Sequence, residues 1–207
     1  MLSSVATATL TGGHIPSSSL KRSAVFSLAR LGFIAATVTG CLLTSATLRA
    51  DVDSGPTAGA AVPPLKVFAV VGDVNGEQVE FTGRREKKPT LYLFVPAEKF
   101  SRPTARLMRK LDEKVAETAA DAEIVAVWVT GNVDETKAYL PRVQMSLKLD
   151  ETTFCVFEGD ASGPQNWGIN TDADLTVVTV IEGQVKQSWG FVSANETVAD
   201  QVLKSLH

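Results

Sequence analysis

Two runs that contain almost no polar residues constrain the fold most strongly. They are TLYLFV, from Thr90 to Val95, and IVAVWV, from Ile124 to Val129. A strand with one wet face alternates polar and apolar residues, whereas a strand covered on both faces is apolar throughout. Both runs therefore predict central strands of a sheet that has layers of structure on both sides, which is the arrangement of an α/β domain.

Helical spacing appears directly after the first of these strands, in Leu107, Met108, Leu111 and Val115. Ser101 is a suitable N-cap for this helix, and Pro103 is tolerated in its first turn. A second helix is predicted from about Asp134 to Leu140, ending near Pro141, because proline interrupts helix hydrogen bonding. The order strand, helix, strand, helix predicts crossover connections between neighbouring parallel strands.

Further β-structure is predicted before and after this central part. Lys66–Val71 and Gln78–Phe81 flank Asn75-Gly76, a strong hairpin signal, and Leu175–Ile181 and Gln184–Gly190 flank Glu182-Gly183. Thr153–Phe157 is predicted as a short strand, and Gly163–Ile169 as a turn that carries Trp167. A final helix is expected to begin with a capping box of Ser193 and Glu196, followed by the apolar face Val198, Val202, Leu203 and Leu206.

The first 50 residues have the pattern of an export signal. Lys21, Arg22 and Arg30 precede an apolar stretch, Leu31 to Leu43, which is shorter than the roughly 20 residues of a membrane span. Val38-Thr39-Gly40-Cys41 resembles the lipobox of bacterial lipoproteins, so Cys41 is a candidate for lipidation; the alternative is cleavage after Ala50. Residues 51–64 are rich in Gly, Ala and Pro and are predicted as a flexible linker to a domain of residues 65–207.

Composition excludes several classes of function. The chain has 207 residues, an apolar fraction of 44% and a net charge of −3 with both signs dispersed, so we expect no nucleic-acid partner. Two cysteines and two histidines cannot supply a zinc site at these positions. No carboxylate cluster has metal-ligand spacing, and we expect neither a metal nor another cofactor.

Three segments resemble those of a known superfamily. DVNGEQVEF is similar to a redoxin hairpin, FEGDASGPQNWGIN to the redoxin segment that ends in a Trp-Gly turn, and LTVVTVIEGQVKQSWGF to the closing redoxin hairpin. The domain is identified as a member of the thioredoxin-like superfamily, in its redoxin or peroxiredoxin-like branch. The resemblance implies an α/β fold, with a central mixed sheet flanked by helices and an N-terminal β-hairpin.

The same resemblance implies reactive cysteines where the first central strand meets its helix, and this sequence has none there. The corner holds Lys99, Phe100, Ser101, Arg102 and Pro103. The superfamily also places a cis-proline before the last hairpin, where this chain has Leu175. Because neither lysine nor arginine exchanges disulfides or reduces peroxide, the sequence offers no catalytic residue at the corner.

Other candidate catalysts are weak. Cys155 lies in a β-type run, which favours a small core side chain over a reactive thiol. A thiol oxidoreductase or peroxidase that uses Cys155 is nevertheless the alternative function. Ser101 would need a histidine base that the sequence does not place nearby. The basic run Arg84–Lys88 is interpreted as a solvated loop or, alternatively, a patch for an anionic partner, and Trp128, Trp167, Trp189 and Phe191 as core or as a peptide groove.

These observations favour an exported, redox-inactive thioredoxin-like protein that acts as a binding or scaffolding module in the cell envelope. Its expected partner is a protein of the envelope, of unknown identity. Its expected location is periplasmic or membrane-anchored, facing away from the cytoplasm, with the membrane reached through a lipid at Cys41.

The mass of the mature protein tests the anchor. If Cys41 is acylated, we expect a chain that begins at Cys41 and carries the added mass of two or three acyl chains, which suffice for stable anchoring. Intact mass spectrometry of the protein and of its Cys41→Ser variant measures this directly. A chain that begins at Asp51 without lipid would rule the anchor out.

Overall fold

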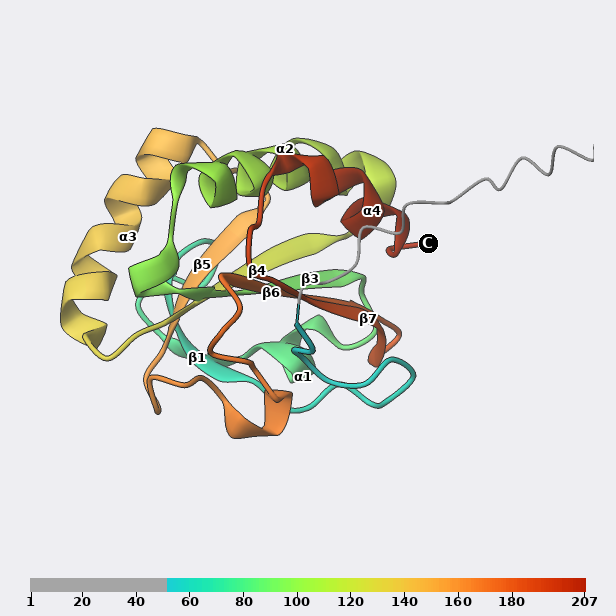
Figure 1. Ribbon diagram of the computed structural model, residues 1–207, viewed down its shortest axis with the longest axis horizontal. Coiled ribbons are helices and arrows are strands. Elements are labelled where there is room, and N and C mark those ends of the chain that lie inside the picture. The colour runs from blue at the N-terminus through green and yellow to red at the C-terminus, as the bar shows by residue number, and fades with distance from the viewer. Residues whose placement is uncertain (1–51) are drawn as a thin grey trace, which may run out of the picture. The chain divides into compact units, whose positions relative to one another are not determined.

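The computed structural model describes residues 52–207, and it contains one seven-stranded mixed sheet with the strand order β2-β1-β5-β4-β3-β6-β7 (Figure 1). The strands are β1 (Lys66–Val71), β2 (Gln78–Glu80), β3 (Thr90–Pro96), β4 (Glu123–Val129), β5 (Thr152–Phe157), β6 (Leu175–Ile181) and β7 (Gln184–Phe191). The α-helices are α1 (Phe81–Arg85), α2 (Arg102–Thr118), α3 (Val133–Leu147) and α4 (Ala199–Lys204). Short 3₁₀ turns are η1 (Ala97–Lys99), η2 (Gln165–Trp167) and η3 (Glu196–Val198).

The two apolar runs form the centre of the sheet, as predicted. β3 and β4 are parallel and pair from Thr90 opposite Glu123 to Pro96 opposite Val129. β5 continues the parallel part beside β4, and β6 runs antiparallel on the other side of β3. Every residue of β3 before Pro96 is buried. The predicted hairpins are both present, as β1–β2 and β6–β7.

The sheet carries a different kind of layer on each face. Helices α2, α3 and α4 lie on one face, and α1, η2 and the segment that leads into β1 lie on the other (Figure 1). Two separate apolar clusters result: one contains Leu107, Leu140 and Val202 from the helices, and the other contains Phe81 and Trp167. The predicted α/β fold, with a central mixed sheet flanked by helices and an N-terminal hairpin, is confirmed.

Helix α2 begins and packs as its sequence predicts. Ser101 is the N-cap, its hydroxyl accepting a hydrogen bond from the Thr104 amide, and Pro103 lies in the first turn. The four apolar residues at helical spacing are all fully buried. A buried polar residue on the same helix was not anticipated: the Asp112 carboxylate accepts bonds from the amides of Asp150 and Glu151, both at 3.0 Å, and from the Thr152 hydroxyl at 2.6 Å. This carboxylate fixes the start of β5 against α2.

The prediction that the second helix stops near Pro141 is wrong, because α3 continues to Leu147 with Pro141 inside it. Pro141 is exposed, so water can bind the Lys137 carbonyl that lacks an amide donor. Beyond the proline, Val143 is buried against the sheet. Burial of that continuing apolar face outweighs the lost hydrogen bond.

The flexible linker predicted for residues 51–64 is also incorrect for the residues that the structure describes. The Val52 amide donates to Gly190 at 3.1 Å, and Gly59 and Val62 donate to the carbonyls of Val185 and Gly183. An edge strand has unpaired backbone groups, and here residues 52–62 satisfy those of β7. Gly190 makes the approach possible, since a Cβ there would lie 2.6 Å from the Val52 carbonyl oxygen. The folded domain therefore starts near Val52.

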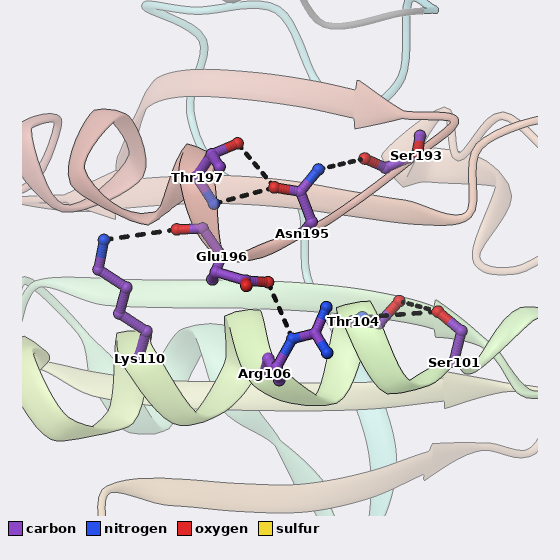
Figure 2. A network of polar contacts seen from close by, with 8 residues as sticks. All are labelled: Ser101, Thr104, Arg106, Lys110, Ser193, Asn195, Glu196 and Thr197. Carbon is purple, nitrogen blue, oxygen red and sulfur yellow. Dashed lines mark hydrogen bonds and ion pairs between the residues drawn. The ribbon is translucent and has the colours of Figure 1, made fainter.

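The N-cap of the last helical segment differs from the predicted capping box of Ser193 and Glu196. Asn195 is the N-cap of η3: its side-chain oxygen accepts from the Thr197 amide at 3.0 Å (Figure 2). Glu196 instead pairs with Arg106 of α2 at 3.1 Å. Because the 3₁₀ turn η3 precedes α4, the N-cap is Asn195, two residues after the predicted Ser193. The spacing of Ser193 and Glu196 alone does not reveal this turn.

Within residues 52–207, no helix has both the length and the apolar character that crossing a membrane requires. The predicted signal segment and Cys41 lie outside the described residues.

Replacement of Asp112 by alanine tests its role in holding β5. We expect Asp112→Ala to lower the free energy of unfolding by about 3 kcal/mol, because two amides and a hydroxyl lose a charged acceptor in a buried site. Urea denaturation followed by circular dichroism measures this. The matched control is Glu113→Ala, at the exposed residue next to Asp112. It should change the free energy of unfolding by less than about 0.5 kcal/mol. Equal stability of the two variants would contradict the assigned role.

Candidate functional site

The corner after β3 lies where the carboxyl ends of the parallel strands β3 and β4 meet, which is where open α/β sheets usually bind ligands. Lys99 is the last residue of η1. Phe100 and Ser101 link it to α2, which begins with Arg102 and Pro103. The five corner residues that the sequence singles out are thus contiguous in space as well as in sequence. Their side chains nevertheless point to different surroundings and have different partners.

Lys99 joins the corner to the loop ahead of β6. Its ammonium donates to the carbonyls of Thr171 and Asp172, both at 2.9 Å, and to that of Ala173 at 3.4 Å. The Asp174 carboxylate lies 3.6 Å away. Backbone carbonyls and one carboxylate thus surround this cation, and Lys99 acts as a clamp between two loops. Lys99 is one of the corner residues near which the resemblance implies a reactive cysteine, and here it holds two loops together.

Leu175 lies on the other side of this clamp, as the first residue of β6. Its side chain is fully buried in the cluster beneath the helices. The residue in place of the superfamily's proline is therefore part of the core. The structure brings Lys99 close to the segment that ends at Leu175, but it leaves no reactive group between them.

The remaining corner residues serve local structure. The Ser101 hydroxyl, which caps α2, lies 2.9 Å from the Thr104 hydroxyl. The only histidine among the described residues is His207, at the end of the chain. Arg102 is exposed. Phe100 packs edge-on against Trp128 with ring centroids 5.6 Å apart. These contacts give Ser101 no general base.

Cys155 does not reach the corner. It lies within β5, is fully buried, and belongs to the cluster on the face of the sheet opposite α2 and α3. Burial raises the pKa of the Cys155 thiol far above its ordinary range, and the nearby Glu123 carboxylate raises it further. Because the thiolate is the reactive form, this environment suppresses thiol chemistry.

The other sequence candidates are mainly structural. Trp128, Trp167, Trp189 and Phe191 are all buried, so they form core and do not line an open groove. In the basic run, Arg85 lies in the unpredicted helix α1, pairs with Glu123 at 2.8 Å and donates to the Pro89 carbonyl at 3.0 Å. No group of three metal-ligating side chains is assembled anywhere in residues 52–207.

Three hollows border the corner, and the third, of about 270 Å³, adjoins α3 at Phe100 and Tyr139. A smaller one of about 190 Å³ lies beside Lys99, between the ends of β3 and β4 and the loops that carry Ser162 and Asn170. A larger one of about 690 Å³ lies between the corner and α3, and its lining includes Glu98, Phe100, Glu135, Tyr139 and Arg142. No signal in the sequence indicated this larger hollow, because its lining comes from segments that only the fold brings together. Arg142, the one lining residue beyond Pro141, belongs to the part of α3 that was not predicted; the spacing Leu140, Val143, Leu147 was the available signal that the helix continues.

Comparison with known proteins shows the fold. No protein-family model matches the sequence, and no curated protein matches it. Among solved structures, reduced Prx3 from Vibrio vulnificus in complex with H₂O₂ is similar, with TM-score 0.55 and 15% identity over 73% of this chain and 99% of that one. A peroxiredoxin-like protein from Aquifex aeolicus has TM-score 0.51 and 15% identity, covering 75% and 91% of the two chains.

A third similar structure is a protein proposed to be the thiol:disulfide interchange protein DsbE of Chlorobium tepidum, with TM-score 0.52 and 17% identity over 73% of this chain and 99% of that one. These similarities confirm the thioredoxin-like fold that the sequence predicted, over 73–75% of the chain.

Removal of the Lys99 charge tests the clamp. We expect Lys99→Met to lower the free energy of unfolding by about 1 kcal/mol, since the ammonium is partly exposed and its bonds are partly screened. Hydrogen exchange should accelerate in residues 171–174.

The matched control is Arg102→Met, which removes a cation from the same corner. That cation has no hydrogen-bond or ion-pair partner among the described residues and lies at a helix N-terminus, where positive charge is unfavourable. This variant should be as stable as the wild type or slightly more stable. Unchanged exchange in residues 171–174 of Lys99→Met would refute the clamp.

Proposed function

We propose that this chain is an exported thioredoxin-like binding module that has no thiol–disulfide or peroxidase activity. The observation that carries the proposal is the clamp at the corner. Lys99 bonds to three backbone carbonyls at the place where the resemblance implies a reactive thiol. Phe100, Ser101 and Arg102 supply no thiol either.

The chemistry of disulfide exchange and peroxide reduction supports this proposal. Each reaction begins with attack by a thiolate on sulfur or oxygen, and the thiolate must be exposed and stabilised. An ammonium has no lone pair with which to attack. Cys155, the only cysteine of the described domain, is buried and held in its thiol form. The fold therefore offers a surface for recognition without an electron-transfer step.

The export pattern supports a place outside the cytoplasm, with Cys41 as a candidate anchor. Since the folded domain starts near Val52, only the roughly 10 residues between Cys41 and Val52 could act as spacer, with a reach of at most about 35 Å. In a lipid-anchored form the domain would stay close to the membrane surface. Its partner would then be a protein at or near that surface.

Assays of redox activity test the proposal. We expect the protein to show no dithiol-dependent reduction of insulin and no peroxide consumption above the buffer rate, because residues 52–207 contain no accessible thiolate. Cys155→Ser should behave as the wild type does. A thioredoxin with its cysteine pair intact is the positive control for insulin reduction, and a peroxiredoxin is the control for peroxide consumption. Turnover that Cys155→Ser abolishes would overturn the proposal and favour the oxidoreductase alternative.

A further inference from the structure

We propose that the groove between the corner and α3 binds an extended segment of a protein partner. The segment would place an apolar side chain between Phe100 and Tyr139, a basic residue on one side of it and an acidic residue on the other. This inference rests on the proposed function, since it names the surface by which a binding module of this kind would act.

The groove runs along α3. Its larger hollow, of about 690 Å³, contains Glu98 and Glu135 at the end where α3 begins. A second hollow of about 270 Å³ continues it along the helix, lined by Val143, Ser146 and Leu147. Phe100, Tyr139 and Arg142 line both hollows. The two hollows therefore form one continuous groove, with two aromatic rings where they meet.

The middle of the groove exposes apolar surface that the fold does not cover. Tyr139 is 47% exposed, although large side chains on a helix that packs on a sheet usually turn inward. Phe100 is half-buried and rests on Trp128. Trp128 is itself fully buried, and the hydrogen-bond donor of its indole has no partner among the described residues. A rigid aromatic floor with an exposed aromatic wall suits an inserted apolar side chain.

Charges of opposite sign line different parts of the groove. Glu98 and Glu135 are exposed carboxylates at the end where α3 begins, and Arg142 is an exposed guanidinium where the two hollows meet. None of the three forms an ion pair within residues 52–207, whereas Lys99, Arg106 and Lys110 nearby all do. The Glu135 carboxylate accepts one hydrogen bond, from the Asn132 side chain at 2.6 Å. Opposite charges without ion-pair partners along a groove are complementary to a partner with the reverse order of charges.

The spacing of these charges fits a peptide. Glu135 and Arg142 are seven residues apart on one face of α3, which is about 10 Å along the helix axis. An extended chain rises about 3.3 Å per residue, so a base and an acid about three residues apart would reach Glu135 and Arg142. The groove is open to solvent along its length and would leave a small molecule largely wet, whereas small-molecule sites bury most of their ligand.

The groove adjoins the smaller hollow beside Lys99, with which it shares Ala97, Glu98, Thr130 and Gly131. Lys99 itself does not line the groove, and its ammonium bonds to carbonyls of the loop ahead of β6. Binding at the groove needs no thiol.

The test is a selection from a library of random 12-residue peptides displayed on phage, with the full chain immobilised through its C-terminus. We expect enriched sequences with a large apolar residue between a basic and an acidic residue that are about three positions apart. The selected peptide, labelled with fluorescein, is then titrated with each variant by fluorescence anisotropy. Tyr139→Ala and Arg142→Glu should each weaken its binding at least about tenfold.

Two controls make the result specific. Met145→Ala removes an apolar side chain that is 68% exposed on the same helix but lines neither hollow, and it should bind as the wild type does. The selected peptide with its acidic residue changed to lysine should recover affinity for Arg142→Glu. Circular dichroism of each variant verifies that α3 is intact.

The failing outcomes are distinct from failure of the proposed function. Absence of enrichment over an uncoated support, or binding that neither Tyr139→Ala nor Arg142→Glu weakens, would overturn the groove assignment. Redox turnover that depends on Cys155 would instead overturn the proposed function, whatever the peptide selection shows.

Discussion

Burial of β3 and β4 on both faces is the constraint on which the rest of the structure depends. Their apolar side chains point alternately to the two faces of the sheet, so neither face can be left to water. One face is covered by α2, α3 and α4, and the other by α1, η2 and the segment before β1. The second cover explains why residues 52–62 pair with β7 and do not extend into solvent. On one face the apolar side chains of the sheet are covered by helices. On the other they are covered mainly by a short chain segment and a 3₁₀ turn with Trp167.

The corner after β3 follows from the same constraint, because a helix that must return over the sheet has to begin just beyond the strand's end. In this position the amides of a helix N-terminus favour a thiolate. This chain has Lys99 and Arg102 there instead. The Lys99 ammonium donates hydrogen bonds to the carbonyls ahead of β6, which offsets the unfavourable interaction of a cation with the N-terminal end of the α2 dipole. The clamp stabilises the two loops that form the smaller hollow. The corner of this fold is thus held by an ammonium that bonds to backbone carbonyls.

The corner residues 99–103 include no thiol, and the fold leaves apolar surface of the neighbouring helix α3 uncovered. Helix α3 buries Leu140 and Val143 on the side that faces the sheet, but it also exposes Tyr139 and Met145. Its position beside the corner creates the groove with Phe100. Recognition by such a surface requires only shape, apolar contact and complementary charge.

The sequence by itself determined the central strands, both hairpins and the start of α2, because hydrophobic period, turn residues and the Ser101 cap are local signals. It also determined that no thiol lies at the corner. Only the tertiary structure decided that α3 continues through Pro141, that residues 52–62 join the edge of the sheet, and that Asn195 is the cap. In each case a distant surface supplied the stabilisation: the sheet beneath Val143, the unpaired edge of β7, and Arg106 of α2, which binds Glu196. The partners of Lys99 lie more than 70 positions away along the chain, so no local pattern could have revealed that it is a clamp and not merely a substituted residue.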